Sequence, residues 1–481
     1  MSATALWSAI ERRLASEGDR LAFDAEKTDG ISYSRLRGLT AAVAEGFEGT
    51  GPVAILANRS FEAYVAVLAC FRFGRVFVPL NPSFPAGRLQ KIVAASGATE
   101  CLYDERHAAL AADLDVAKRR IDLGLPSVER EPIEAVADTR AYHLFTSGST
   151  GEPKGVPITH GSLSHYVTQI ARLVGIPEHS RSTQFFDLSF DPSLHDIFVG
   201  LSTGGTVIPA NDMAMLMPHR YVAANRIDIW FSVPLLAVLA ARGQRSMPAD
   251  TKLRMAMFAG EGLPGEYAAG IRQLMPEGGE VWNLYGPTEG TIIVTGRKLT
   301  EEDFEKPVVS IGRSFGENRL AVLADGAILP AEGGSEGELL LGGPQIFEGY
   351  EPPVASDCFV YDAGGERFYR SGDLVRCENG TVEYLGRIDS QVKIRGLRVE
   401  LGEIEAVCVK QDGVDAAAAL VLGEGANVHI VVAYQGDPDA DFSALGDSLP
   451  AYMVPKRTRH FDALPVNSSG KVDRKALKQV L

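Results

Sequence analysis

The sequence has no excess of positive charge and no long apolar run, and we expect no signal sequence. Its 481 residues include 62 acidic and 47 basic side chains, which give a formal net charge of −15. A surface of this charge repels polyanions, so we expect no nucleic-acid partner. The apolar run at 64–80 contains Arg72 and Arg75 and falls short of the roughly 20 apolar residues that cross a bilayer. Three charged residues at 11–13 interrupt the N-terminal stretch, where we expect an amphipathic helix.

Paired cysteines are also lacking. The five cysteines stand at positions 70, 101, 358, 377 and 408, with no CxxC pair and no neighbouring histidine cluster. Free thiols of this kind fit a reducing compartment. We therefore expect a soluble, cytoplasmic protein without a membrane span.

The pattern of apolar residues predicts a layered α/β fold. Hydrophobic residues make up 45% of the chain, which is enough for a substantial core. Short apolar runs, such as PVAIL at 52–56 and VFVPL at 76–80, alternate with longer helical patterns from about residue 30 to 345. This alternation favours α/β layers with largely parallel sheets.

The pattern of apolar and turn residues changes twice in the last third of the sequence. Between 306 and 390, short strand-like pieces separated by glycine-rich turns indicate a β-rich subdomain. After Asp389, a mixture of strand-like and helical segments indicates a small α+β unit. We predict a large N-terminal domain over residues 1–388 and a small, mobile α+β C-terminal domain over 389–481.

One short run combines glycines, hydroxyl side chains and a lysine in a way that suits a phosphate. Glycine lets backbone N–H groups approach an anion, hydroxyls donate to its oxygens and the lysine adds charge. The run follows the strand-like AYHLF and precedes VPITHGSL, so we expect a strand, a turn and a helix, although a flexible surface turn is the alternative. The order does not match a Walker loop. The candidate phosphate-binding residues are Thr146, Ser147, Gly148, Ser149, Thr150, Gly151 and Lys154.

The run TSGSTGEPKG resembles the phosphate loop of the adenylate-forming superfamily, which includes acyl-CoA synthetases, luciferases and the adenylation domains of nonribosomal peptide synthetases. Other signatures of that superfamily follow in order over nearly the whole chain. They are NLYGPTEGT at 283–291, GELLLGG at 337–343, YRSGDLV at 369–375, GRIDSQVKIRGLRVELGEIE at 386–405 and LPVNSSGKVDRKAL at 464–477. The resemblance implies ATP and Mg²⁺ as cofactors.

The resemblance also assigns roles around the nucleotide. Tyr285 would stack on adenine, and Glu289 would hold Mg²⁺, since carboxylate oxygens suit a hard cation. Thr288 would lie near the α-phosphate, and Asp373 would bind the ribose. The resemblance adds Gly260, Glu261, Asn283, Gly286 and Arg387 to the ATP site.

By the same resemblance, the tail carries a catalytic lysine and a hinge. Attack of a carboxylate on the α-phosphorus brings two anions together, so a positioned ammonium group assists it. Lys471 would supply that charge; taken alone it would be a surface lysine. Asp389 matches the family hinge between the two domains.

The segment FDPSLHDIF at 190–198 resembles the part of amino-acid adenylation domains whose aspartate pairs with the substrate ammonium group. The resemblance places Asp191 in that role, while an exposed or helix-capping aspartate is the alternative, and Asp187 and Asp196 lie nearby. His195 could instead be a core residue. The side-chain pocket carried over from the family consists of Asp191, Pro192, His195, Ser232, Met257, Ala259, Leu284, Ile292 and Ile293.

These resemblances imply a two-step ligase. An amino acid and MgATP would give aminoacyl-AMP and pyrophosphate, and the phosphopantetheine thiol of a separate carrier protein would then accept the aminoacyl group. The chain ends ten residues after Lys471, so we expect a stand-alone enzyme, similar to D-alanine:carrier-protein ligases. Ala240 replaces the pocket cysteine of those ligases, which speaks against D-alanine. Transfer to free CoA, as in an acyl- or aryl-CoA ligase, and a non-enzymatic scaffold are the alternatives.

Overall fold

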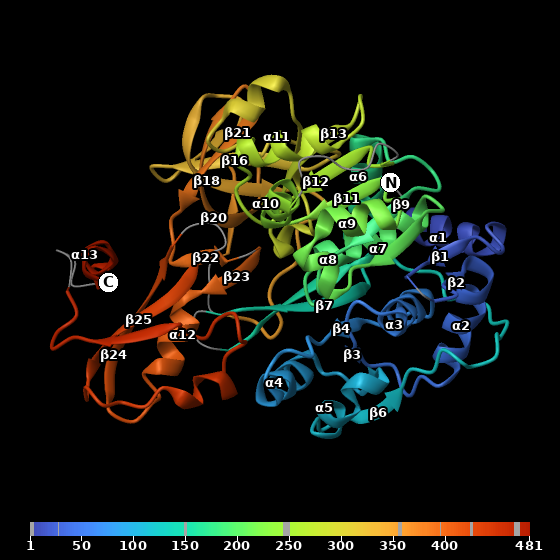
Figure 1. Ribbon diagram of the computed structural model, residues 1–481, viewed down its shortest axis with the longest axis horizontal. Coiled ribbons are helices and arrows are strands. Elements are labelled where there is room, and N and C mark those ends of the chain that lie inside the picture. Colours follow the sequence, from blue (N-terminus) through green and yellow to red (C-terminus); the bar gives the residue numbers. More distant parts are fainter. Residues whose placement is uncertain are drawn as a thin grey trace.

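Two large, mostly parallel sheets form the body of the protein (Figure 1). The computed structural model describes residues 4–26, 28–148, 152–243, 251–354, 358–394, 396–423, 427–465 and 472–481. The first sheet has the strand order β15-β14-β13-β12-β11-β9-β10-β1-β2, and the second has the order β6-β5-β3-β4-β7-β8. The first comprises β1 (Leu21–Phe23), β2 (Ile31–Ser32), β9 (Arg181–Gln184), β10 (Thr206–Pro209), β11 (Ile229–Ser232), β12 (Met255–Phe258), β13 (Glu280–Tyr285), β14 (Thr295–Lys298) and β15 (Arg313–Ser314). The second comprises β3 (Val53–Leu56), β4 (Phe77–Pro79), β5 (Glu100–Tyr103), β6 (Ala117–Arg120), β7 (Arg140–Thr146) and β8 (Lys154–Thr159).

Helices cover both faces of each sheet, which explains why the central strands are apolar on both sides. In β12, Met255 and Met257 join the core that the two sheets share, whereas Ala256 and Phe258 pack in the core on the opposite face. The shared core receives residues from α1 (Thr4–Ser16), α2 (Tyr33–Glu45), α3 (Phe61–Arg72), α6 (His160–Val174) and α7 (Pro192–Ser202). The outer face of the first sheet packs against α8 (Asp212–Leu216), α9 (Pro218–Ala224), α10 (Pro234–Gly243) and α11 (Gly265–Leu274). The outer face of the second packs against α4 (Ala86–Ser96) and α5 (Ala108–Ala112).

An antiparallel sheet follows the α/β layers, as the glycine-rich texture after residue 306 predicts. Its strands run in the order β17-β16-β18-β20-β19, and β21 pairs with β20. They are β16 (Arg319–Ala324), β17 (Ala327–Pro330), β18 (Ser335–Gly342), β19 (Phe359–Tyr361), β20 (Arg367–Glu378) and β21 (Thr381–Arg387). Short 3₁₀ helices occur at Glu105–His107, Thr288–Gly290, Glu301–Glu305 and Ser443–Asp447.

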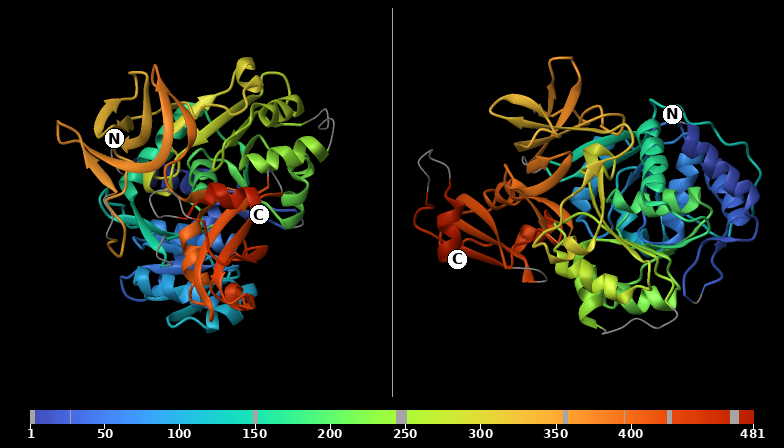
Figure 2. Two further views of the ribbon diagram at one scale, coloured as in Figure 1. Left: turned by 90° about the vertical axis from the view of Figure 1, so that its left-hand side faces the viewer. Right: turned by 90° about the horizontal axis from the view of Figure 1, so that it is seen from above.

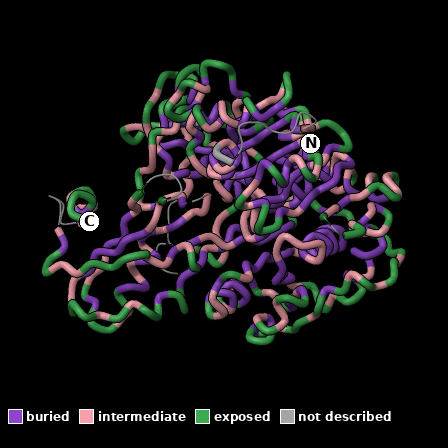
Figure 3. The backbone as a smooth tube through the Cα atoms, viewed as in Figure 1, coloured by how far each residue is buried: buried purple, intermediate pink, exposed green. Residues whose placement is uncertain are grey.

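The chain from residue 391 onward, called here the C-terminal unit, has its own sheets and its own core. It contains the hairpin β22 (Gln391–Ile394) and β23 (Leu397–Glu400), helix α12 (Leu401–Cys408), the sheet of β24 (Val414–Leu422), β25 (His429–Gly436) and β26 (Arg457–His460), and helix α13 (Arg474–Val480). Figure 2 shows this unit beside the body, with the hairpin on the side of the body. In Figure 3 the buried segments, drawn in purple, include strands of the body and of the C-terminal unit. The predicted α/β fold class is confirmed; the boundary at residue 389 remains a prediction.

The structure agrees with the expected helix at the N-terminus. Helix α1 buries Leu6, Ile10 and Leu14 in the shared core. Over the described ranges, none of the helices combines the length and the hydropathy that a membrane crossing requires.

A buried ion pair fastens α1 to α2 and α3. The Arg72 side chain on α3 is 1% exposed, and its Nε donates to Glu11 Oε1 on α1 at 2.6 Å. Its other nitrogens donate to Glu11 Oε2 at 2.9 Å and to the Arg37 carbonyl of α2 at 2.9 Å. A buried guanidinium needs such partners, because removing one leaves its charge uncompensated.

Glu11→Ala should therefore destabilise the body by about 3 kcal/mol, the lower end for a broken buried pair, because Glu11 itself is 17% exposed. The measurement is the free energy of unfolding from urea titration followed by tryptophan fluorescence. Glu45→Ala, at an exposed position of α2, is the matched control and should stay within about 0.5 kcal/mol of wild type. Equal, small effects of the two substitutions would contradict the role of this pair.

Candidate functional site

The carboxyl ends of the parallel strands of the first sheet meet at one edge. Ligands of open α/β sheets bind at such edges, because the loops that leave neighbouring strands converge there. The loop after β12 carries Ala259, Gly260 and Glu261, and the loop after β13 carries Gly286 to Glu289. Asp191 lies after β9, directly before α7. Segments far apart in the sequence are thus brought to one place, as the candidate site requires.

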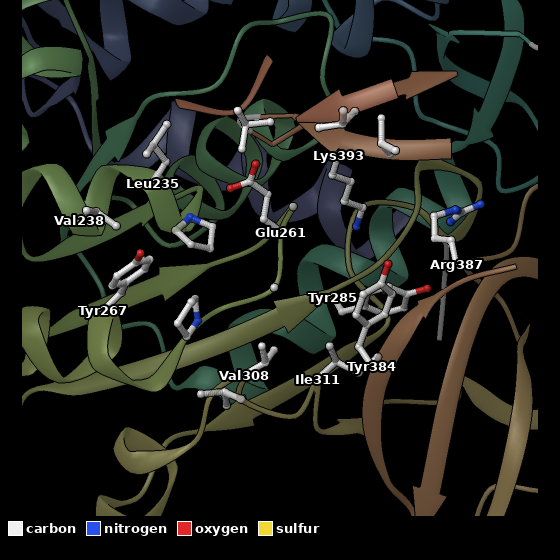
Figure 4. Close-up of a pocket in the computed structure, with 18 of the residues that line it drawn as sticks. Leu235, Val238, Glu261, Tyr267, Tyr285, Val308, Ile311, Tyr384, Arg387 and Lys393 are labelled. Carbon is white, nitrogen blue, oxygen red and sulfur yellow. The ribbon is translucent and has the colours of Figure 1, made fainter. Parts of the chain in front are cut away.

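Two adjoining cavities open at this edge. The larger, about 620 Å³, lies between the body and the C-terminal unit and is lined by Glu261, Tyr285, Arg387 and Lys393 among others (Figure 4). The smaller, about 360 Å³, extends to Asp191. The two cavities share the lining residues Gly260, Tyr285, Arg387, Gln391 and Lys393. They form one continuous region with a nucleotide-sized part and a smaller, more apolar part.

A hydrogen-bonded cluster lies where the two cavities meet. The Tyr285 hydroxyl donates to Asp373, and the Arg387 guanidinium donates to Asp373 at 2.7 Å and to Asp389 at 2.7 and 2.6 Å. The Lys393 ammonium lies 5.5 Å from the centre of the Tyr285 ring (Figure 4). Burial lowers the pKa of Lys393, although the nearby Asp373 charge opposes the shift. An aromatic ring that can stack on a nucleotide base thus lies beside carboxylate and basic groups that can form hydrogen bonds with a ribose.

Asn283 has a different position from its neighbours in the signature. Its Nδ2 donates to the carbonyls of Val309 and Ser310 at 3.3 and 3.0 Å. Asn283 is buried, and it is not among the described residues that line the two cavities. The structure therefore commits the amide nitrogen of Asn283 to the backbone in this arrangement.

The buried carboxylate of Glu289 is paired with a cation from the C-terminal unit. Arg398 on β23 donates to both oxygens of Glu289, at 2.9 and 2.8 Å, and the Tyr350 hydroxyl donates at 2.7 Å. Glu289 is fully buried. Burial alone would raise the pKa of Glu289, but the Arg398 charge and the Tyr350 hydrogen bond hold it below its ordinary value. Sequence reasoning missed both partners, since no local pattern relates residues so far apart in the chain.

The donor chemistry around Glu289 suits Mg²⁺. The carboxylate of Glu289 provides an oxygen ligand that this hard cation prefers, and the guanidinium shows that the position holds a positive charge. Both carboxylate oxygens are occupied by Arg398 in this arrangement. A metal ion at Glu289 would therefore take the place of the Arg398 guanidinium.

Asp191 is a buried carboxylate at the end of the smaller cavity. Its Oδ2 accepts from the Ile292 N–H at 3.2 Å. Burial, followed by the negative charge of Glu289, raises the pKa of Asp191 to about 7, against hydrogen bonds that lower it. The carboxylate has no cationic partner among the described residues. It can therefore receive a cation from a ligand.

A strained turn presents the Ile292 N–H to Asp191. Thr291 and Ile292 both have positive φ, 56° and 72°, which is uncommon for β-branched residues. Gln345, fully buried, holds this turn: its Nε2 donates to the carbonyls of Ile293 at 2.7 Å and Thr291 at 3.3 Å. No local pattern singles out Gln345, because it acts through the backbone of another segment.

Only some of the residues predicted for the side-chain pocket line the smaller cavity. Asp191, Pro192, Ala259, Ile292 and Ile293 line the smaller cavity. Leu284 lines the larger one, and Met257 is buried in the core that the two sheets share. Ala240, expected where D-alanine ligases have a pocket cysteine, is instead buried in the core on the outer face of the first sheet. Further lining of the smaller cavity, not expected from the sequence, comes from Phe186, Phe190, Val233 and Leu236.

His195 and Ser232 are buried in the interior, and neither is among the described residues that line the smaller cavity. The His195 Nδ1 is 2.6 Å from the Tyr166 hydroxyl, and burial lowers the pKa of His195 to about 3. The Ser232 hydroxyl accepts from the Trp230 indole N–H at 2.8 Å. The interpretation of His195 as a core residue, hydrogen-bonded to a tyrosine hydroxyl, fits these contacts better.

The predicted phosphate loop joins two strands. β7 and β8 are antiparallel, and α6 begins only at His160, so the segment VPIT is strand and not the start of a helix. A Cβ on Gly148 would lie 2.2 Å from the Glu152 carbonyl, which explains the glycine. The Ser147 hydroxyl donates to the Arg398 carbonyl at 3.3 Å. Ser149, Thr150, Gly151 and Lys471 lie outside the described residues.

Close packing of the hairpin on the site depends on a glycine. Gly396 has φ +80°, its N–H donates to Glu261 Oε1 at 2.6 Å, and an added Cβ would lie 2.2 Å from Val233 Cγ1. Gly365 has nearly the same φ, +81°, but no atom within 4 Å of an added Cβ. A comparison of substitutions at the two glycines therefore separates the effect of a clash with Val233 from the effect of backbone strain.

We predict that Gly396→Ala lifts the hairpin and raises hydrogen exchange over residues 396–408 about tenfold, because an opening equilibrium shifted by about 1.4 kcal/mol changes exchange by that factor. Gly365→Ala should leave that segment unchanged. Val233→Ala in the Gly396→Ala background should restore protection, because it removes the clashing methyl group. Equal exchange in the two glycine variants would refute the packing role.

Comparisons with known proteins agree with this architecture. Residues 10–351 match the family described as AMP-binding enzyme. Phosphinothricin tripeptide synthetase PhsC of Streptomyces viridochromogenes is 35% identical over 91% of the chain, and malpinin synthetase of Mortierella alpina is 34% identical over 93%. The chain spans 41% and 6% of the lengths of these two relatives.

Solved structures give the same result. The adenylation domain AlmE of Vibrio cholerae, solved with glycyl-adenosine-5′-phosphate, superimposes with a TM-score of 0.86 at 28% identity, over 99% of this chain and 97% of that one. The family match covers well over half of the chain. The resemblance to the adenylate-forming superfamily is thereby confirmed, and the chain belongs to the family of AMP-binding enzymes.

Proposed function

We propose that this protein activates an amino acid with MgATP to aminoacyl-AMP and then transfers the aminoacyl group to a phosphopantetheine thiol. The observation that carries the proposal is Asp191, a buried carboxylate facing a small cavity beside the cluster of Tyr285, Asp373 and Arg387. A carboxylate in such surroundings is costly without a cationic partner, and the ammonium group of an amino acid supplies one. The glycyl adenylate held by AlmE supports the same ligand chemistry.

In the first step, a carboxylate oxygen of the amino acid attacks the α-phosphorus of ATP. A P–O bond to that oxygen forms as the bond to pyrophosphate breaks, and pyrophosphate leaves with the electron pair. Tyr285 and Asp373 hold the base and the ribose, with Arg387 orienting Asp373. The phosphate loop and Thr288 hold the phosphates, and Lys471 balances the charge that builds on the α-phosphate. Mg²⁺ held by Glu289 neutralises phosphate charge when it is bound.

In the second step, a thiol sulfur attacks the carbonyl carbon of the adenylate. A C–S bond forms, the C–O bond to the phosphate breaks, AMP leaves and the thiol proton is released to solvent. We assign the described arrangement, with the hairpin β22–β23 at the site, to this step. Asp389 is the proposed hinge, at the boundary between domains 1–388 and 389–481. The proposed acceptor is a separate carrier protein in the cytoplasm.

Pyrophosphate exchange over a panel of amino acids and their des-amino analogues tests this function. Asp191→Ala would leave the ammonium of a bound amino acid unpaired, a loss on the order of 3–5 kcal/mol. The kcat/KM for the amino acid should then fall by roughly two to four orders of magnitude. A des-amino acid has no ammonium group, so its exchange should change little.

Pro192→Ala, the next residue along the same cavity wall, is the control for a general disturbance of the pocket. It should affect the amino acid and its des-amino analogue alike. Equal losses for both substrates in Asp191→Ala would show that Asp191 is structural and would move the function to activation of acyl or aryl acids.

The pKa of Asp191 also predicts a pH dependence. Burial and the Glu289 charge raise it to about 7 in the free enzyme, so the group is protonated below that pH and cannot pair with an ammonium. The KM for the amino acid should rise about tenfold for each pH unit below 7 and level off above it. Asp191→Asn should abolish this dependence at a uniformly high KM. A pH-independent KM in the wild-type enzyme would be inconsistent with this role.

A further inference from the structure

A second ion pair between the body and the C-terminal unit lies outside the cavities. Arg88 on α4 donates to Glu403 on α12, and the two side chains are only 6% and 2% exposed. In Figure 1, α4 and α12 face each other across the interface. Neither residue is among the described residues that line the two site cavities. The pair cannot act by touching a substrate in them.

Aromatic rings enclose this pair. The Arg88 guanidinium lies 5.3 Å from the centre of the Phe84 ring, which is 6.4 Å from the ring of Tyr452. Tyr452, from the C-terminal unit, packs against the core of that unit and also against the outer core of the second sheet. The rings join the two parts of the molecule around the charges and keep water from them.

Burial leaves two polar atoms of the pair without hydrogen bonds to the described residues. Arg88 Nε and Glu403 Oε2 are buried and have no hydrogen-bond partner within the described part of the chain. Such a pair adds little net stability, because desolvation of both charges offsets their attraction. Loss of one partner, by contrast, leaves an uncompensated buried charge and is strongly unfavourable. The pair therefore discriminates between arrangements of the two parts more than it stabilises either of them.

The place of Glu403 in the chain connects this pair to the active site. It lies in the first turn of α12, and α12 begins directly after β23, the strand that carries Arg398. Fixing the start of α12 against α4 therefore fixes the hairpin that brings Arg398 to Glu289 and Gly396 to Glu261. If the C-terminal unit moved elsewhere, Arg88 and Glu403 would separate and become hydrated.

We propose that Arg88 and Glu403 are a positioning pair that selects the arrangement used for transfer to the thiol and has no part in adenylate formation. This inference rests on the proposed two-step function. It predicts that breaking the pair slows the second step alone. It also predicts that two apolar residues of similar size in place of the pair restore the arrangement, because only the unpaired charge opposes it.

The test compares Arg88→Met, Glu403→Leu and the double variant with wild type. Adenylate formation is measured by pyrophosphate exchange with the preferred amino acid, and transfer by thioester formation on pantetheine. Spin labels on cysteines introduced at Ala109 and Lys410, both exposed, report the distance between the body and the C-terminal unit without any substrate. Cys358, which is not fully buried, is replaced by serine in the labelled proteins.

Each single variant should lower the rate of transfer at least tenfold and leave exchange within twofold of wild type. The population with the wild-type label distance should fall in the single variants and return in the double variant, which should regain transfer to within about threefold. Arg376→Met, which breaks the exposed pair with Glu336 inside the antiparallel sheet, is the control and should change neither rate.

Several results would overturn the proposal. They are single variants that leave transfer within twofold of wild type, single variants that lower exchange as much as transfer, and a double variant that stays as slow as the single ones. A failure of the proposed function would look different, because wild-type enzyme would then support no exchange with any amino acid. The label distances would still decide whether the pair positions the C-terminal unit.

Discussion

The ion pair between Arg398 and Glu289 is the contact on which the described arrangement depends. It joins a strand of the C-terminal unit to the loop after β13, and its two side chains are 22% and 0% exposed. Neither charge could remain there alone, because the desolvation of one unpaired ion exceeds what neighbouring hydrogen bonds return. The position of the hairpin and the ionisation of Glu289 are therefore set by the same contact.

The charge of Glu289 also affects the pKa of Asp191. The charge of Glu289 is the second cause, after burial, of the raised pKa of Asp191. A cation at Glu289 screens that charge, whether it is the guanidinium of Arg398 or a metal ion. The pKa of Asp191 therefore depends on which cation is bound at Glu289.

The fold was largely predictable because its signals are local. Apolar runs with turn residues between them mark buried strands, and glycine-rich spacing marks the antiparallel sheet. The contiguous signatures likewise placed Tyr285, Asp373 and Asp191 at the site. Prediction failed where the signal was ambiguous or distant. VPIT reads as a helix start but pairs with β7, and Arg398, Tyr350 and Gln345 act across long separations in the chain.

The charges of the two parts are complementary at the site. The body contributes the carboxylates of Glu261, Glu289 and Asp373 together with the guanidinium of Arg387, and the hairpin adds the cations Lys393 and Arg398. A polyphosphate beside these carboxylates would be repelled unless cations accompanied it. The hairpin supplies Arg398 to the fully buried Glu289, whereas Asp373 already has Arg387 of the body as its partner. Under the proposed two-step function, loss of the polyphosphate would leave Glu289 without a cation unless Arg398 bound it, so the two steps would favour different positions of the C-terminal unit.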